Sequence, residues 1–200
     1  QPQVIRLAST PWCPYICDDI NQPGFIVEYM TKLLSMSGIV LKVEVFPWSR
    51  AILLARRGNY DGLLTAVSSE APDFHLTKQP SGTYQVCLYK KIGRDVKYVD
   101  RRSFQNRILG GIKNYGYGEP IDSLISNPKN NEKAYFISHN KPHKALIHMT
   151  NKNRIDLFPE DSAVMELFIK KNPHLELVEI AGCIEEVPFF TAIYPNHPQK

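Results

Sequence analysis

The chain has 200 residues, a formal net charge of +4 and 43% hydrophobic residues. This length suits one large domain or two small lobes, and the apolar fraction is ordinary for a globular protein. The basic residues occur in scattered pairs rather than along a stripe, which argues against a nucleic-acid-binding face, and no apolar run is long enough to cross a membrane.

The N-terminal stretch predicts a strand, an aromatic loop and a helix. Val4–Ala8 is an apolar run typical of a buried strand. The loop that follows is rich in proline, aromatic residues and cysteine, and a turn at Gln22–Gly24 leads into a helical period. Its apolar side chains recur every three or four residues and lie on one face: Phe25, Tyr29, Leu33 and Met36. Gly38 stands where this helix should end.

The next elements continue the alternation. Leu41–Phe46 alternates apolar and charged residues, as a half-buried strand does. Pro47, with Ser49 as a candidate cap, begins a helix that ends at Gly58. Leu63–Val67 is a third apolar strand. The order strand, helix, strand, helix, strand predicts a parallel sheet with crossover helices.

The second half repeats this α/β alternation without repeating the sequence. Strands are expected at Tyr84–Lys90, Arg107–Ile112, Lys133–Ser138, Asp156–Phe158, Leu175–Ile180 and Pro188–Tyr194. Helices are expected at Ile121–Ile125, His143–Asn151 and Asp161–Lys171. We therefore expect two lobes joined by two crossings, one of residues 1–83 and 189–200 and one of residues 84–188, each a mostly parallel sheet flanked by helices. Such a body closes on a ligand by hinge motion.

The four cysteines indicate disulfides rather than a metal site. They form no Cys-x-x-Cys pair, and no histidine stands at zinc-ligand spacing. Three pairings are open on sequence alone. We favour Cys87 with Cys183, and Cys13 with Cys17 if the loop brings them close. Gln1, which a strand follows directly, is typical of a mature N-terminus after removal of a signal peptide, or of a trimmed chain.

Ordered motifs along nearly the whole chain resemble one known family. The segments that carry the likeness are Trp12–Tyr15, Pro23–Phe25, Pro47–Ala51, Gly58–Gly62, Arg154–Asp161 and Phe190–Pro195. In these the chain resembles the bacterial extracellular solute-binding proteins of the polar-amino-acid type, which serve ABC transporters. The resemblance implies a two-lobed periplasmic-binding-protein-like fold. It also implies a periplasmic or secreted monomer, without cofactor, catalysis or membrane insertion, that captures an amino acid or amine in the interlobe cleft and meets transporter membrane subunits.

Aromatic residues in the first lobe are the first candidates for ligand contact. Trp12 and Tyr15 follow the first strand, where ligands bind in open α/β sheets. They form either an aromatic wall for a ligand or ordinary loop packing. Trp48 either lines the cleft or packs as the hydrophobic staple of its helix.

The segment after the third strand departs from the family pattern. The family usually carries Thr-x-x-Arg there, whose arginine grips an α-carboxylate, and the segment from Thr65 to Pro72 has no arginine. Arg50 is a candidate replacement, because a guanidinium binds carboxylate in bidentate fashion, or else a solvated charge. By resemblance the segment offers backbone and hydroxyl groups to the ligand, from Thr65, Ala66 and Ser68. Glu70 either favours a cationic ligand or is a solvent-exposed carboxylate at a helix start.

The second lobe supplies a glycine-containing loop and an aspartate. The loop follows a strand and precedes a helix, so its backbone N–H groups are predicted to face an anion. Its candidate residues are Lys113, Tyr115, Gly116 and Tyr117. The Gly-Lys-Ser/Thr of a P-loop is absent, so nucleotide hydrolysis has no support. By resemblance Asp161 receives a ligand amino group, and its position also suits a helix N-terminus.

Two other functions stay open at this point. A few members of the resembled fold family are dehydratases that act on a prephenate-like ring, and Glu70, Asp161 or His139 are the residues that could serve as the general acid. The same two-lobed body also occurs outside the membrane as a sensor or adaptor domain, and the missing arginine fits that alternative.

Overall fold

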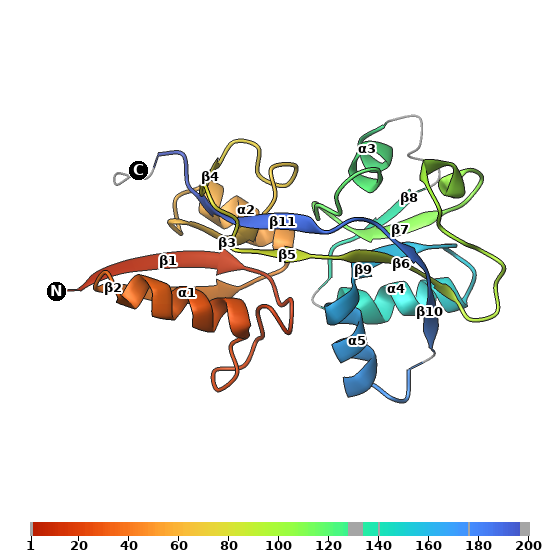
Figure 1. Cartoon of the computed structure of the whole chain (residues 1–200), viewed down its shortest axis with the longest axis horizontal. Coiled ribbons are helices and arrows are strands. Elements are labelled where there is room, and N and C mark those ends of the chain that lie inside the picture. Colours follow the sequence, from red (N-terminus) through yellow and green to blue (C-terminus); the bar gives the residue numbers. More distant parts are fainter. Residues whose placement is uncertain (1, 128–133, 140, 176, 197–200) are drawn as a thin grey trace. The chain divides into compact units, whose positions relative to one another are not determined.

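The chain divides into two units. In the computed structural model, residues 2–127, 134–139, 141–175 and 177–196 are described. Unit 1 consists of residues 1–83 and 188–200, and unit 2 of residues 84–187. Figure 1 labels the helices and strands of both units. The predicted strand start at Lys133 and the predicted lobe end at 197–200 lie outside the described residues.

Unit 1 is built on a mixed sheet. Its strands are β1 (Gln3–Ser9), β2 (Ile39–Val45), β3 (Gly62–Ala66), β4 (His75–Leu76), β5 (Gly82–Tyr84) and β11 (Val187–Ile193). They run in the order β2-β1-β3-β11-β4, with β5 paired to β11. β1 is parallel to β2 and β3, which confirms the predicted crossovers. β11 returns along β3 in the antiparallel direction and makes the sheet mixed.

Two helices cover the parallel part of this sheet. α1 (Phe25–Ser35) packs on β2, and α2 (Trp48–Arg56) packs on β1 and β3. Pro47 is the N-cap of α2, and no side chain caps this helix end. Ser49 lies inside the helix, so its predicted capping role is wrong. The extended backbone of the proline already sets the entry angle. Gly58 follows the helix at φ +76°, where glycine is favoured.

The apolar period of α1 predicts the helix correctly, but it does not mark the buried face. Ile26 and Met30 are the buried residues of α1. The four residues that share the predicted face are between 45% and 81% exposed: Phe25, Tyr29, Leu33 and Met36. Periodicity alone therefore identified the element but not the side that packs on the sheet.

The described residues of unit 2 form two smaller sheets. Its strands are β6 (Val86–Lys91), β7 (Leu109–Ile112), β8 (Ala134–Ile137), β9 (Phe158–Asp161) and β10 (Val178–Cys183). β7 and β8 pair in parallel, and β10-β6-β9 form an antiparallel sheet. The expected mostly parallel sheet is thus confined here to β7 and β8. The chain enters the unit along β6 and leaves along β10, so these neighbours run in opposite directions.

The helices of unit 2 lie close to their predicted positions. They are α3 (Ile121–Ser126), α4 (Pro142–Asn151) and α5 (Ser162–Lys171), with the short 3-10 helix η1 (Arg101–Phe104) before β7. Two strands are displaced from their predictions: β9 begins at Phe158 rather than Asp156, and β10 extends to Cys183. β9 ends in two acidic residues, Glu160 and Asp161, yet all of its residues are buried. Its acidic end therefore does not show the strand pattern in the sequence.

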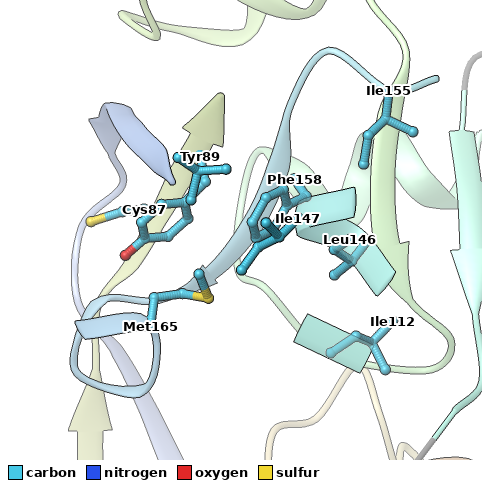
Figure 2. Packing of buried hydrophobic residues seen from close by; sticks show 9 residues of the cluster. Cys87, Tyr89, Ile112, Leu146, Ile147, Ile155, Phe158 and Met165 are labelled. Carbon is cyan, nitrogen blue, oxygen red and sulfur yellow. The ribbon is translucent and has the colours of Figure 1, made fainter. Parts of the chain in front are cut away.

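The core of unit 2 joins helices and strands around one apolar cluster (Figure 2). Tyr89 and Phe158 stack within it, with ring centroids 5.4 Å apart. The cluster consists of Cys87, Tyr89, Ile112, Leu146, Ile147, Ile155, Phe158, Met165 and Val178. Burial, with the charges of nearby carboxylates, raises the pKa of the Tyr89 phenol above its ordinary range. This cluster holds α4 and α5 against β6 and β9.

The two disulfides are those that the sequence favoured. Cys13 pairs with Cys17 inside the first loop of unit 1, and Cys87 pairs with Cys183 in unit 2. The second bond joins residues 96 positions apart and ties β6 to β10, where the two cysteines stand opposite each other in the strand register.

We expect Asp73→Asn to make the acid limb of the stability profile shallower. Arg56 donates to both carboxylate oxygens of Asp73, at 2.7 and 2.8 Å, and this pairing lowers the pKa of Asp73. A carboxyl whose folded pKa lies below its unfolded value stabilises fully above the unfolded value, about 3.9, and loses that effect as the pH falls through the folded pKa. Both side chains are nearly half exposed, so the contribution is below about 1 kcal/mol.

Urea unfolding of both proteins at pH 7 and pH 3 measures this effect. The variant should be less stable than the wild type at pH 7, and the difference should shrink at pH 3. Asp95→Asn is the control, because Asp95 is exposed and makes no ion pair among the described residues. A difference at pH 7 that persists unchanged at pH 3 would contradict the prediction.

Candidate functional site

The first-lobe candidates follow three parallel strands of unit 1 that end at the same edge of the sheet. Ser9 and Val45 are the last paired residues of β1 and β2, and β3 ends at Ala66. The loops after these ends carry or adjoin the predicted residues Trp12, Tyr15, Trp48, Arg50, Thr65, Ala66, Ser68 and Glu70. The carboxyl edge of a parallel sheet is where α/β proteins bind ligands. The topology therefore brings these candidates to one edge of unit 1.

The aromatic loop is packed within unit 1. Trp12 and Tyr15 stack with centroids 4.2 Å apart, and Phe189 of β11 meets both edge-on at 5.5 and 5.9 Å. The two stacked side chains are only 8% and 7% exposed. The backbone of Trp12 also forms a small bridge with Ile16, next to the disulfide of this loop. These contacts are those of the loop-packing alternative, with each ring using one face against the other.

Trp48 and Glu70 form a polar contact between α2 and the turn after β3. The Trp48 Nε1–H donates to Oε1 of Glu70 at 3.0 Å, and the N–H of Val67 donates to Oε2 at 3.0 Å. Trp48 is 4% exposed. The Glu70 carboxylate thus closes the turn of residues 67–70 instead of extending into solvent from a helix start, and both of its oxygens accept a hydrogen bond.

The remaining first-lobe candidates differ in burial. Thr65 and Ala66 are buried at the end of β3, whereas Ser68 and Arg50 are exposed. The Arg50 guanidinium lies over the ring of Phe46, 5.6 Å from its centroid. It is therefore positioned by a cation–π contact at the start of α2.

Sequence reasoning missed Ser9, the last residue of β1. Its side chain is fully buried, and its hydroxyl makes no hydrogen bond among the described residues. A buried hydroxyl without a partner costs free energy unless a ligand or water satisfies it. Its place at the carboxyl end of a parallel strand was the signal that could have found it.

In unit 2 the predicted loop and Asp161 also follow neighbouring strand ends. Leu109 of β7 forms a parallel bridge with Leu157, the residue before β9. β7 and β9 therefore end on the same side. The loop from Lys113 to Tyr117 follows β7, and Asp161 is the last residue of β9. The hydroxyl of Tyr84 donates to the carbonyl oxygen of Gly116 in this loop.

Two amides of the glycine-containing loop face an anion, but this anion is a carboxylate of the chain itself. The N–H groups of Tyr117 and Gly118 donate to the carboxylate of Asp122 at 2.8 and 3.1 Å. The amides of Lys113 and Tyr115 donate to backbone carbonyl oxygens. Asp122, in the first turn of α3, is thus the anion that this loop already binds, a contact that sequence spacing alone left unassigned. Tyr117 is buried, and its hydroxyl accepts from the N–H of Ile112 at 2.7 Å.

Asp161 is held in one orientation by the backbone. It is 1% exposed, and its two carboxylate oxygens accept from the N–H groups of Val164 and Gln85 at 2.9 and 3.1 Å. The first bond makes Asp161 the N-cap of α5, which confirms the helix-terminus alternative.

A second buried carboxylate, that of Glu160, contacts the backbone of Asp161. Glu160 is 2% exposed, and its Oε1 accepts the N–H of Asp161 at 2.8 Å. Its Oε2 lies 2.7 Å from Nε2 of His143 on α4. Sequence reasoning missed the contact between Glu160 and His143. Two adjacent carboxylates, Glu160 and Asp161, at the end of an apolar strand are unusual and could have marked it.

Two further observations concern metal binding and membrane crossing. No group of three or more histidine, cysteine, aspartate or glutamate side chains among the described residues could hold a metal ion. Within the same part of the chain, no helix combines the length and apolar character that crossing a bilayer requires.

No protein-family model matches the sequence, and no curated protein sequence matches it. Solved structures, however, match nearly the whole chain. An ancestral arginine-binding protein bound to glutamine is 15% identical, with a TM-score of 0.74 over 98% of this chain and 86% of that chain. A histidine kinase sensor domain with similarity to periplasmic binding proteins is 12% identical, with a TM-score of 0.79 over 98% and 84%.

The fold is periplasmic-binding-protein-like. A third structure agrees: the arginine-, lysine-, histidine-binding protein ArtJ from Geobacillus stearothermophilus is 13% identical, with a TM-score of 0.74 over 100% of this chain and 85% of that chain. The predicted periplasmic-binding-protein-like α/β fold is confirmed, whereas the mostly parallel sheet expected in the second lobe is not found among the described residues of unit 2. At these identities the similarity establishes the fold alone.

Proposed function

We propose that the chain is a periplasmic solute-binding protein that captures a small polar ligand with an amino group, an amino acid or an amine, for an ABC transporter. In this proposal the two units are the two lobes of the binding protein. The observation that carries it is the buried, backbone-oriented carboxylate of Asp161 at a strand end, in a fold that amino-acid-binding proteins share.

Five residues have a role in this proposal. Asp161 accepts the ligand amino group, since an oriented carboxylate in a low-dielectric site binds a cation strongly. The buried hydroxyl of Ser9 and the exposed guanidinium of Arg50 contact the polar end of the ligand. The packed aromatic pair of Trp12 and Tyr15 stiffens the loop that follows β1. No chemical step is required, because the ligand acts by shifting an open–closed equilibrium.

A thermal-shift screen tests this proposal. The panel holds the protein amino acids, agmatine, putrescine, cadaverine and small dicarboxylates. A ligand present at a hundred times its Kd stabilises the native state by about 2.7 kcal/mol, which for a chain of this size raises Tm by roughly 5 to 10 °C. Asp161→Asn should abolish the shift: its amide oxygen still accepts the N–H of Val164 and keeps the helix cap, whereas the contact with the N–H of Gln85 is lost.

The matched control is Asp95→Asn, which removes an exposed carboxylate of unit 2 and should leave the shift intact. If no member of the panel stabilises the protein, or if Asp161→Asn responds as the wild type does, solute capture through Asp161 is wrong.

A sensor domain is the second candidate function, favoured by the similarity to a histidine kinase sensor domain. It predicts the same ligand binding but a different partner. Purification of the full-length native protein separates the two, since a sensor carries a signalling domain on the same chain and a transport protein does not.

A further inference from the structure

Unit 2 contains a cavity that the proposed function does not use. It has a volume of about 450 Å³, a size typical of small-molecule sites. Arg101 and Arg107 line it together with the apolar side chains of Phe104, Leu109, Leu124 and Ile125. We call it the arginine pocket.

The arginine pocket lies at the end of β7 opposite the loop of the proposed amino-acid site. Leu109 and Ala134, which line it, are the first residues of the parallel strands β7 and β8 and are paired with each other. The loop from Lys113 to Tyr117 follows the other end of β7. Four residues of strand separate the two ends by roughly 10 Å, so this pocket is not an extension of that loop.

The described lining of the pocket is positively charged. Three arginines and no aspartate or glutamate are among its described lining residues. Arg102 is neutralised by Asp100, which its guanidinium contacts at 2.6 Å. Neither Arg101 nor Arg107 forms an ion pair with a described carboxylate. Two guanidinium charges therefore remain for a ligand.

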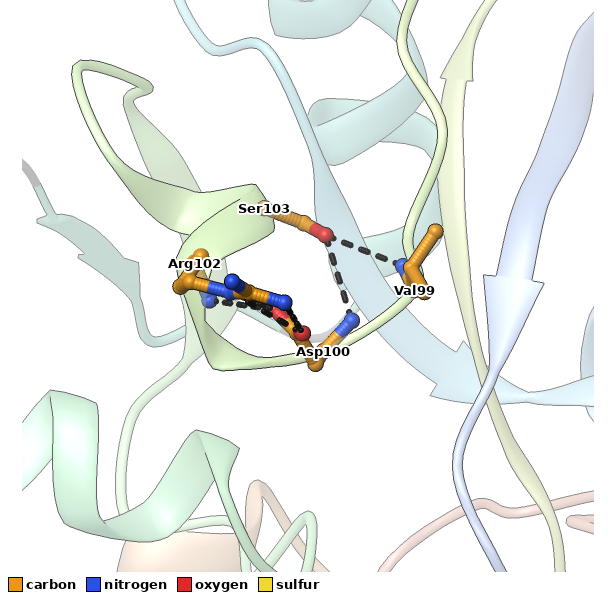
Figure 3. A network of polar contacts seen from close by, with 4 residues as sticks. All are labelled: Val99, Asp100, Arg102 and Ser103. Carbon is orange, nitrogen blue, oxygen red and sulfur yellow. Dashed lines mark hydrogen bonds and ion pairs between the residues drawn. The ribbon is translucent and has the colours of Figure 1, made fainter.

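The scaffold of the pocket is ordered by a capping box (Figure 3). The Asp100 side chain accepts from the N–H of Arg102 at 2.8 Å, and Ser103 Oγ accepts from the N–H groups of Val99 and Asp100 at 2.9 and 3.3 Å. Arg107 donates from Nε to the carbonyl oxygen of Ser103 at 3.1 Å. This bond orients the guanidinium of Arg107 while its two terminal nitrogens stay available for bidentate pairing.

We propose that the arginine pocket binds a small organic anion whose carboxylate pairs with Arg101 and Arg107 and whose apolar body packs on Phe104, Leu109 and Leu124. The combination of arginines with apolar side chains in one lining selects for an anion with a hydrophobic body over a bare anion. This inference does not rest on amino-acid capture, and it stands whether or not Asp161 binds a ligand.

Isothermal titration of the whole chain with 4-phenylbutyrate tests the proposal. The wild type should bind it, and Arg101→Gln should weaken binding about tenfold or more, the effect of losing a charge-assisted hydrogen bond. Arg154→Gln is the matched control, since it removes an exposed arginine of unit 2 outside the pocket and should leave the affinity unchanged. Arg107→Lys is the second variant, which keeps the charge but loses the fork and should also weaken binding.

Three results would overturn the proposal. The first is absence of 4-phenylbutyrate binding to the wild type. The second is equal binding of the neutral 4-phenylbutyramide or of inorganic phosphate, which would show that charge or apolar body is dispensable. The third is equal weakening by Arg101→Gln and Arg154→Gln, which would indicate general attraction to a basic protein.

Discussion

Replacing Cys87 and Cys183 together by alanine should lower the free energy of unfolding by about 4 to 5 kcal/mol. Their bond closes a loop between residues 96 positions apart, and the entropy that a cross-link removes from the unfolded chain grows with loop length. The bond also ties the entering strand β6 to the leaving strand β10. Cys87 is 1% exposed, so its alanine variant gives up packing as well.

The second disulfide supplies a matched comparison. Cys13 and Cys17 are only four positions apart, so the same entropy model assigns their bond about 2 kcal/mol. Chemical unfolding of the two double-alanine variants beside the wild type measures both values. An equal loss of stability in the two variants would show that loop length does not set the contribution of these bonds.

The elements of the fold were largely predictable because their signals are local. The residues that carry apolar periodicity and helix capping lie within about ten positions of one another in the sequence. They located α1, α2, α4 and α5 and the parallel strands β1, β2 and β3. The buried face of α1 was not predictable in the same way, since the packing of Ile26 and Met30 depends on the sheet beneath them.

The candidate site was less predictable, because side-chain contacts join residues far apart in the sequence. Nothing near Trp12 indicates that Phe189, in the last strand, will pack against its ring. The loop of Tyr117 shows the same limit: its glycines suit an anion, and the anion that its amides meet is Asp122. Asp161 was placed correctly at a helix start because that contact is local, at Val164.

Removing His143 should be among the most damaging single changes in unit 2. Its Nε2 lies 2.7 Å from Oε2 of Glu160, and the two side chains are 10% and 2% exposed. In the wild type the Glu160 carboxylate contacts His143 and the N–H of Asp161. His143→Leu would leave this carboxylate buried and would keep the second contact but not the first. Breaking a buried pair in this way costs about 3 to 5 kcal/mol, because the charge left behind is not compensated.

The sign of Glu160→Gln should depend on whether His143 is present. In the wild type this substitution weakens the contact with His143 and should destabilise the protein. In the His143→Leu background it replaces a stranded charge with a neutral amide that still accepts the N–H of Asp161, so it should recover about 1 to 3 kcal/mol. A double-mutant cycle of the four proteins by urea unfolding measures the coupling directly. The exposed pair of Arg6 and Glu44 is the control, with an expected coupling below about 1 kcal/mol.

The same cycle also connects stability with the proposed site. Glu160 accepts the backbone N–H of Asp161. His143→Leu, which removes the other contact of Glu160, should therefore lower ligand affinity, although neither His143 nor Glu160 is proposed to touch the ligand. Glu160→Gln in the His143→Leu background keeps the acceptor and should regain affinity together with stability. If Glu160→Gln destabilises equally in both backgrounds, His143 and Glu160 are not coupled. If His143→Leu keeps the wild-type ligand affinity, Glu160 does not support ligand binding through Asp161.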